Sequence, residues 1–525
     1  MIIAQTVMFQ GTASHVGKSW LATALCRILV QDGYKVLPFK SQNMALNSYV
    51  TPEGGEIGRA QALQALAART VPRVDMNPIL LKPKADTMAQ VVVMGKPIGD
   101  MGAWDYRSDY MDMAVKIVAA SLERLMQDAD IVVIEGAGSP AEINLKDREI
   151  VNMRIAKLAK APVLLVADID RGGVFASIIG TLELLEPWER AVIKGLIINK
   201  FRGDKRILDP GLEFLAERTG IPILGVIPHS NVCLEQEDSV SLEGVAGWLH
   251  HTDDVQRKGE IDIAVIHLPH ISNFTDFDPL AMEPTVTLRY IKDSTRLGKP
   301  DVVIVPGTKN TVHDLHWLKQ RGFSERLLDL WTAGQSIVGI CGGYQMMGTL
   351  LKDVSGIGDR PGEYAGLGLL PIHTTFFPDK KTCLVAGKMD PELTEIWGGG
   401  TSEPPLVKGY EIHMGRTEYS GSSRPLFRLT REEDVGDGGV EDGVYSADGR
   451  LFGTYLHGLF ENGQFRWLWL NFLRRRKGLP ELTAEEGALD YWEVREKNLD
   501  QWARVVRQNL DIAEVMAIIR KGVLL

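Results

Sequence analysis

The chain has 525 residues, which suggests roughly two to four domains. Hydrophobic residues make up 45% and charged residues 24% of the sequence, and these proportions are those of a globular protein. The formal net charge of -10 argues against broad nucleic-acid binding, which usually needs a basic face. We therefore expect no nucleic-acid partner.

The cysteines and the apolar runs limit the setting of the protein. The four cysteines are far apart and form no C-x-x-C pair, so neither a disulfide framework nor a zinc site is indicated. They are Cys26, Cys233, Cys341 and Cys383. The N-terminal apolar run lacks a preceding charged region and leads into a glycine loop, so it predicts a strand and not a signal peptide. No apolar run approaches the ~18 residues of a membrane span. We expect a cytoplasmic protein without a membrane partner.

Short apolar runs recur along the chain and alternate with helical patterns. Runs that are apolar on both faces are typical of buried parallel strands. Their alternation with helices indicates α/β units. The runs cover residues 131–134, 163–166, 196–198, 263–266, 302–305 and 337–340. The sequence therefore predicts an α/β protein with parallel sheets.

A polar, acidic segment over residues 231–260 has no strand pattern and predicts a linker. We expect one domain over residues 1–230 and a second over 261–465. Residues 466–525 are rich in Trp, Leu, Arg and Glu, and the spacing of their apolar residues predicts helices. We expect this helical segment to pack against the second domain.

The stretch FQGTASHVGKSW (9–20) ends in Gly17, Lys18 and Ser19, the tail of a phosphate-binding loop. A predicted strand precedes the loop and a predicted helix follows it, so backbone N–H groups and the positive helix end would face the phosphates. Lys18 would reach the β/γ-phosphates, and the Ser19 hydroxyl would hold Mg²⁺. The usual pattern has glycine at position 12, whereas this chain has Gly11 followed by Thr12.

Two further strand ends fit the same site. The run 131–134 leads into Glu135 and glycines, and a carboxylate at the carboxyl end of a parallel strand lies where such sheets bind ligands. Glu135 is the second candidate for Mg²⁺. Asn199 follows the run 196–198 and could either contact an adenine edge or cap a turn.

A second site is indicated by GICGGYQMMG (339–348), where Cys341 follows a predicted strand and precedes a helix. Small flanking residues permit the strained turn that exposes a nucleophile. A cysteine nucleophile needs a base. His457, at the end of another apolar strand pattern, is the best candidate, and His413 is the alternative. The amides of Gly307 and Gly342 could form an oxyanion hole.

These two sites together resemble those of the glutamine-hydrolysing cobyric acid synthases. The first part is similar to dethiobiotin-synthetase-like ATP-dependent ligases, in which Gly-Thr begins the loop. The part from residue 261 resembles a class I glutamine amidotransferase. The stretches that carry the resemblance are KSQNMALNSYVT (40–51), IEGAGSPAEINL (134–145), ADIDRGGVFAS (167–177), INKFRGD (198–204), PGTKNT (306–311), GYEIHMG (409–415) and TYLHG (454–458).

The resemblance implies two doubly wound α/β domains, a P-loop NTPase-like domain and a flavodoxin-like amidotransferase domain. It implies Cys341 as nucleophile, His457 as base and Asn199 as an adenine contact. Gln42, Asn43 and Asn47 become candidates for substrate binding. The wider amidotransferase pattern has Glu two residues after the histidine, but here that residue is Leu. Either Glu461 or a backbone carbonyl could orient the histidine instead.

The implied reaction is ATP- and glutamine-dependent amidation of carboxylates b, d, e and g of adenosylcobyrinic acid a,c-diamide, in cobalamin biosynthesis. ATP would form an acyl phosphate, and ammonia from glutamine, passed between the domains, would displace the phosphate. The alternatives are the a,c-diamide synthase or another amidotransferase of this type, and a partition-type ATPase with a degenerate second domain. The oligomeric state stays open, with a homo-oligomer among the options.

Overall fold

The computed structural model describes residues 4–523, except 86, 107–109, 233, 236–260, 355, 358–359, 399–402, 422, 432–438 and 484–489. The predicted linker therefore falls mostly outside the described residues. The chain forms two compact units. The first unit comprises residues 1–45, 55–235 and 495–525, and the second comprises 46–54 and 236–494.

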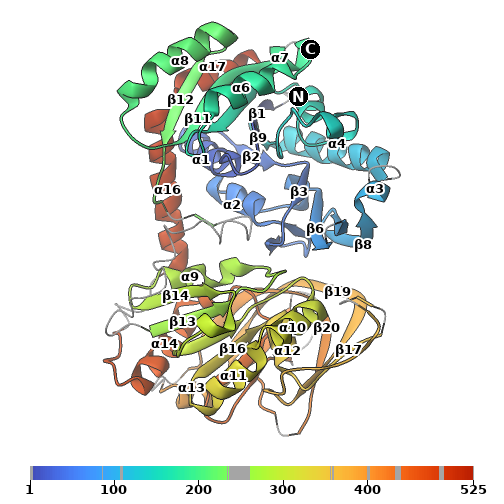
Figure 1. Cartoon of the computed structure of the whole chain (residues 1–525), viewed down its shortest axis with the longest axis vertical. Helices are drawn as coiled ribbons and strands as arrows, with labels where there is room; N and C mark the ends of the chain where they lie inside the picture. Colours follow the sequence, from blue (N-terminus) through green and yellow to red (C-terminus); the bar gives the residue numbers. More distant parts are fainter. Residues whose placement is uncertain are drawn as a thin grey trace. The chain divides into compact units, whose positions relative to one another are not determined.

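A six-stranded parallel sheet forms the centre of the first unit, in the order β12-β11-β10-β1-β9-β2 (Figure 1). Its strands are β1 (Gln5–Gly11), β2 (Val36–Phe39), β9 (Ile131–Glu135), β10 (Val163–Asp168), β11 (Ile193–Phe201) and β12 (Ile223–Pro228). The three apolar runs predicted in this part of the chain all lie in these strands. Because β1 and β10 are both central, the loop after β1 lies at the middle of the carboxyl edge.

The side chains of each strand alternate between two hydrophobic cores, which explains why the runs are apolar throughout. Met8 packs into one core, whereas Val7 and Phe9 pack into the other. Helices cover both faces of the sheet, as a doubly wound fold requires. These helices include α1 (Lys18–Gln31), α2 (Arg59–Ala67), α4 (Met111–Asp128), α5 (Met153–Ala159), α6 (Val174–Glu183), α7 (Pro187–Val192) and α8 (Lys205–Thr219).

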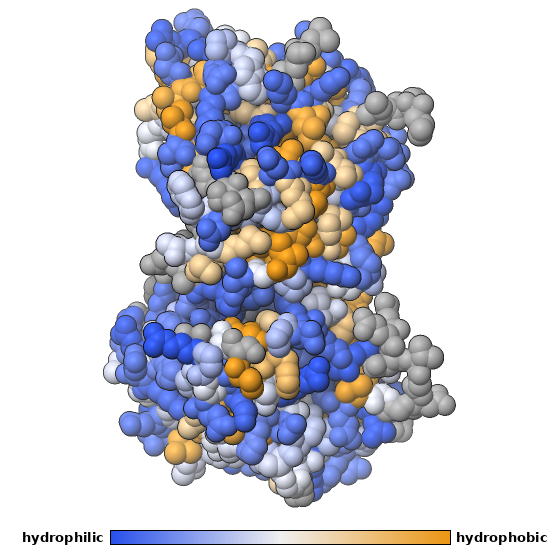
Figure 2. Space-filling model, turned by 90° about the vertical axis from the view of Figure 1, so that its right-hand side faces the viewer, coloured by the Kyte–Doolittle hydropathy of each residue, from blue (hydrophilic) through white to orange (hydrophobic). Residues whose placement is uncertain are grey.

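A smaller sheet extends the first unit, in the order β3-β6-β7-β8. Its elements are β3 (Gln42–Met44), β6 (Ile79–Ala85), β7 (Met88–Val93) and β8 (Lys96–Gly102), followed by α3 (Ala103–Asp105). Met88, Ile98 and Trp104 from this region are exposed. Figure 2 faces the side on which β8 and α3 lie, and it shows apolar patches on a largely hydrophilic surface. Exposed apolar side chains thus lie on β7, on β8 and in α3, at the end of the small sheet away from β3.

The terminal helices pack in the first unit, so the expectation that they pack against the second domain is wrong. From Arg495 onward, α16 (Tyr491–Asn509) and α17 (Ile512–Lys521) belong to the first unit. Trp502 and Ile518 are buried in the same core as Phe9 of β1. Within the predicted helical segment, α14 (Gly463–Arg476) packs in the second unit instead.

The second unit also has a mainly parallel central sheet, in the order β14-β13-β15-β16-β24-β23, with only β23 antiparallel. The strands are β13 (Ile261–Ile266), β14 (Val286–Ile291), β15 (Val302–Val305), β16 (Ser336–Ile340), β23 (Val444–Tyr445) and β24 (Leu451–Thr454). Its helices include α9 (Asp278–Ala281), α10 (Thr311–Gln320), α11 (Phe323–Thr332), α12 (Gly342–Met347) and α13 (Pro391–Ile396). The α/β fold predicted for both parts of the chain is confirmed.

A second sheet in this unit runs in the order β18-β17-β19-β21-β22, with β20 paired to β19. Its strands are β17 (Leu350–Asp353), β18 (Gly362–Ala365), β19 (Ile372–Met389), β20 (Leu406–Tyr419), β21 (Phe427–Arg431) and β22 (Val440–Asp442). The short strand β4 (Ser48–Val50) also belongs to the second unit, whereas β5 (Glu56–Gly58) belongs to the first. Among the described helices, none is long and apolar enough to cross a membrane.

Candidate active sites

The phosphate loop joins β1 to α1 in the first unit, as its motif predicts. Gly17 stands before α1 with φ of 99°, a left-handed conformation that favours glycine. A Cβ on Gly11 would lie 2.6 Å from Cγ2 of Val16 and 2.9 Å from Nζ of Lys18. The backbone N–H of Thr12 donates to the Val166 carbonyl at 2.9 Å and so extends the sheet. The loop folds back so closely over Gly11 that this position has no room for a side chain.

Lys18 and Ser19 lie at the start of α1, beside the end of β9. Nζ of Lys18 donates to the carbonyls of Ala13 and Gly138, at 3.0 and 3.1 Å. The Ser19 hydroxyl donates to a carboxylate oxygen of Glu135 at 2.7 Å. The structure therefore brings together the two side chains that the sequence nominates for Mg²⁺.

Glu135 is buried and held by three further side chains. Lys40 forms an ion pair with it at 2.8 Å, and Gln64 and Gln61 donate to its other oxygen at 2.6 and 3.5 Å. Burial raises the pKa of Glu135, but Lys40, with help from hydrogen bonds, holds that pKa below its ordinary value. The carboxylate is thus kept ionised, as a cation ligand must be.

Asn199 supports the loop directly. Its Nδ2 donates to the Val16 carbonyl at 2.8 Å, and a Cβ on Gly17 would lie 2.1 Å from the same nitrogen. Nζ of the next residue, Lys200, donates to the His15 carbonyl at 2.6 Å. Asn199 thus contacts the loop, and its predicted role at adenine stays a prediction.

The three candidate substrate residues are in different surroundings. Gln42 is half-buried and accepts a hydrogen bond from the Tyr106 hydroxyl at 2.5 Å. Asn43 is buried and donates to Gln61 at 2.9 Å, which links it to the side chains around Glu135. Asn47 belongs to the second unit. The three residues therefore have different described surroundings, and their predicted role at the substrate stays a prediction.

In the second unit, Cys341 occupies a strained turn between β16 and α12. Its φ of 49° and ψ of -108° are unusual for a residue with a side chain. A Cβ on Gly343 would lie 1.9 Å from the Val305 carbonyl oxygen, and a Cβ on Gly339 would lie 2.4 Å from Sδ of Met347. The neighbouring glycines are thus needed for the close approach that a nucleophile elbow requires.

His457 and Asp276 complete this site. Nδ1 of His457 lies 2.7 Å from a carboxylate oxygen of Asp276, whose other oxygen accepts from the Gly458 N–H at 3.0 Å. The options that the sequence suggested for this role, Glu461 and a backbone carbonyl, are therefore wrong. Asp276 lies in the one-turn helix η5 (Phe274–Phe277), 181 positions from His457, and no spacing motif links the two.

The base is buried, charged and close to the nucleophile. Burial lowers the pKa of His457, but the charges of Asp276 and Cys341, and the hydrogen bonds that the imidazole makes with each, raise it to about 10. His457 is therefore protonated at neutral pH beside the cysteine. By contrast, the ring of the alternative base, His413, stacks on Tyr455, and its Nδ1 lies 2.7 Å from the Gly415 carbonyl.

The two glycines nominated for the oxyanion hole border the same site. A Cβ on Gly307 would lie 3.3 Å from Cε1 of His457, and a Cβ on Gly342 would lie 2.7 Å from Cγ2 of Thr308. The loop that contains Gly307 is therefore packed against both the base and the turn after Cys341. The predicted role of the two amides in an oxyanion hole stays a prediction.

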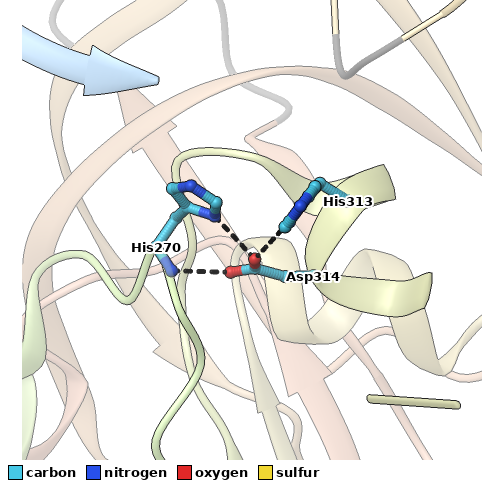
Figure 3. A group of neighbouring side chains, drawn as sticks. All are labelled: His270, His313 and Asp314. Carbon is cyan, nitrogen blue, oxygen red and sulfur yellow. Dashed lines mark hydrogen bonds and ion pairs between the residues drawn. The ribbon is translucent and has the colours of Figure 1, made fainter. Parts of the chain in front are cut away.

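A polar cluster of His270, His313 and Asp314 lies next to that loop, and Figure 3 shows both histidines pointing toward the Asp314 carboxylate. The buried carboxylate of Asp314 accepts hydrogen bonds from the Thr308 hydroxyl at 2.5 Å and from the His270 N–H at 3.1 Å. Its other oxygen lies 2.7 Å from Nδ1 of His270 and 3.3 Å from Nδ1 of His313. The partners of Asp314 thus tie the end of β13 to the loop after β15 and to α10.

Comparisons with known proteins match both parts of the chain. The family of CobQ/CobB/MinD/ParA nucleotide binding domains matches residues 7–239, and that of CobB/CobQ-like glutamine amidotransferase domains matches residues 262–465. A cobyric acid synthase of Desulforamulus reducens is 51% identical over 99% of this chain and 99% of its own length. That of Pelotomaculum thermopropionicum is 50% identical over 98% of this chain and 97% of its own length. One from Geobacillus thermodenitrificans is 47% identical over 98% of each chain. The chain therefore belongs to the cobyric acid synthase family.

Proposed function

We propose that the protein uses ATP and glutamine to convert carboxylates b, d, e and g of adenosylcobyrinic acid a,c-diamide into amides, a step of cobalamin biosynthesis. The observation that carries this proposal is the presence of two complementary sites in one chain. One pairs a phosphate loop with the buried Glu135, and the other pairs Cys341 with a charged His457. Membership of the cobyric acid synthase family supports the choice of substrate.

The first unit would activate the carboxylate. Hydroxide is a poor leaving group, so ATP would phosphorylate the carboxylate and ammonia would then displace phosphate. Lys18 would move from its present carbonyl partners to the β/γ-phosphates. Ser19 and Glu135 fit Mg²⁺, because their oxygens lie 2.7 Å apart and hard oxygen ligands suit this ion. When bound, Mg²⁺ would neutralise charge on the phosphates.

The second unit would release ammonia from glutamine. Sγ of Cys341 would attack the amide carbon, and His457 would protonate the departing nitrogen, leaving a thioester that water hydrolyses to glutamate. Asp276 would hold the imidazole with its other nitrogen toward the cysteine. The N–H groups of Gly307 and Gly342 would stabilise the oxygen that becomes negative during the attack.

The corrinoid would bind to the first unit. The polar side chains of Gln42 and its neighbours are uncharged and could hydrogen-bond the substrate's carboxylates without repelling them. The exposed Met88 and Ile98 of the same small sheet and Trp104 of α3 would suit the apolar faces of a corrin ring. The alternative of an a,c-diamide synthase is not favoured, because the curated relatives that match along nearly the whole chain are cobyric acid synthases.

The proposal is tested by separating the two nitrogen sources. We expect Cys341→Ala to abolish synthesis from glutamine but to keep synthesis from added ammonium. We expect Lys18→Ala to lose synthesis from either source while it still releases glutamate from glutamine. Mass spectrometry of the corrinoid counts the amides formed. A Cys341→Ala protein that ammonium does not rescue, or a fully active Lys18→Ala protein, would contradict the assignment.

A further inference from the structure

The segment of residues 46–54, here called the inserted segment, belongs to the second unit although the residues before and after it belong to the first. Four of its side chains are fully buried. They are Asn47, Ser48, Val50 and Thr51. A surface loop that only joined two strands would not bury this many polar groups. The segment is therefore packed as a structural part of the amidotransferase unit.

One end of the inserted segment holds the turn that carries Asp276. Oδ1 of Asn47 accepts a hydrogen bond from the Phe274 N–H at 3.1 Å. In return, the Ser48 N–H donates to Oδ1 of Asn273 at 3.1 Å. Asn273 is left-handed, with φ of 52°, and its carbonyl accepts from the Asp276 N–H at 3.0 Å. These reciprocal bonds fix the turn from which Asp276 reaches His457.

A further contact of the inserted segment connects it to both the base and the nucleophile. Val50 packs with Tyr410 and Ile412 in a small hydrophobic cluster. The Tyr410 ring stacks on the His457 ring, with centroids 5.2 Å apart and planes 16° apart. The Ile412 carbonyl accepts from Sγ of Cys341 at 3.5 Å. The inserted segment thus contacts Ile412, which accepts a hydrogen bond from the nucleophile, and Tyr410, which stacks on the base.

We propose that the inserted segment is a positioning element for glutamine hydrolysis and that Asn47 is its principal positioning residue, acting through the Asp276 turn. This inference rests on the proposed function, and it replaces the expectation that Asn47 binds the corrinoid. Asn47 would act through its hydrogen bond to Phe274 and not on the reacting atoms. By holding the turn, it keeps the Asp276 carboxylate within hydrogen-bond distance of His457, where the carboxylate orients the imidazole and favours its protonated form.

The test measures glutamate release and ammonium-dependent synthesis on the same variants. We expect Asn47→Ala to lower kcat for glutamine hydrolysis by about tenfold, because a buried hydrogen-bond donor loses its acceptor. The KM for glutamine and the ammonium-dependent rate should be unchanged. Asn273→Gly keeps the positive φ but removes the second bond, and it should have a similar effect. Since both bonds hold one turn, the double variant should lose less than the product of the two effects.

Pro52→Ala is the matched control, because Pro52 is an exposed residue of the same segment. It should leave both rates unchanged. The inference is overturned if Asn47→Ala keeps full glutamate release but raises the KM for the corrinoid with either nitrogen source. It is also overturned if both rates fall together. Failure of the proposed function would differ, since the unaltered protein would then release glutamate without amidating the corrinoid.

Discussion

At the scale of the residue, the contact between Asp276 and His457 sets the charge of the second site. The pKa of His457 is raised to about 10 mainly by the charge of Asp276, against the opposing effect of burial. The imidazole is therefore protonated below this pH. A neutral side chain at position 276 would remove the largest effect that raises the pKa of His457, so the imidazole would lose its proton at lower pH.

We therefore expect Asp276→Asn to reduce glutamine hydrolysis by about 10²–10⁴-fold, the usual contribution of a positioned acid or base. Alkylation of Cys341 by iodoacetamide near neutral pH should slow as well, because the imidazolium beside it is lost. Burial raises the pKa of Cys26 and, to about 12, that of Cys383, so these thiols should react little. Asp278→Asn, which removes a carboxylate two residues along the chain at the start of α9, serves as the control. An unchanged alkylation rate in Asp276→Asn would contradict this account.

Sequence patterns reveal the residues of these sites only where a local motif contains them. Lys18 and Cys341 each lie in a short strand-to-helix stretch, so the sequence identifies them and their surroundings. Asp276 could not be found in this way, because only the folded chain brings it to a histidine 181 positions away. The same limit applies to the hydrogen bond between Asn47 and Phe274, because the two residues lie 227 positions apart and no local motif contains both.

At the scale of the element, the unusual phosphate loop depends on the absence of a side chain at Gly11. We expect Gly11→Ala to weaken ATP binding by at least about tenfold, equivalent to ~1.4 kcal/mol. The reason is that the new Cβ would meet both Val16 and Lys18 within 2.9 Å. Gly180→Ala, in α6, adds a Cβ with no atom within 4 Å and should bind ATP normally. Isothermal titration calorimetry measures both affinities. Equal affinities for the two variants would show that the loop accommodates the side chain.

The terminal helices show that an amphipathic pattern predicts a helix but not the partner against which its apolar face packs. The spacing of apolar residues over 466–525 correctly predicts helices, but it does not say which sheet their apolar faces cover. Where α16 packs depends on residues in other parts of the chain, such as Arg27 of α1. Arg27 is buried and forms ion pairs with Glu496 and Asp500 of α16, at 2.7 Å each. Nothing near Arg27 in the sequence indicates partners so distant along the chain.

Because α16 completes the core of the first unit, its buried tryptophan should matter for stability. Trp502 donates to the Trp20 carbonyl at 2.7 Å, and the two rings meet edge to face at 5.6 Å. We expect Trp502→Ala to lower the free energy of unfolding by about 3–5 kcal/mol, as loss of a buried tryptophan does. Thermal unfolding measures the change. Trp492→Ala, on the same helix but 44% exposed, should cost much less, and equal losses would refute the packing argument.

At the scale of the whole molecule, the two sites in one chain suggest that nitrogen goes from glutamine to the corrinoid without mixing with the solvent. Ammonia that escapes at neutral pH is mostly protonated, and ammonium is not a nucleophile. A chain that delivers its own ammonia would avoid this loss. The resemblance to the cobyric acid synthases implies such a transfer, and labelled nitrogen tests it directly.

We expect the unaltered protein, given glutamine with a heavy amide nitrogen and an excess of ordinary ammonium, to place mainly heavy nitrogen in the product. The control is an equal mixture of Lys18→Ala, which only releases ammonia, and Cys341→Ala, which only uses it. In that mixture the ammonia must cross the solvent, so the product should carry mainly ordinary nitrogen. Mass spectrometry of the amidated corrinoid distinguishes the two. The same dilution in the unaltered protein and in the mixture would mean that ammonia is released before it is used.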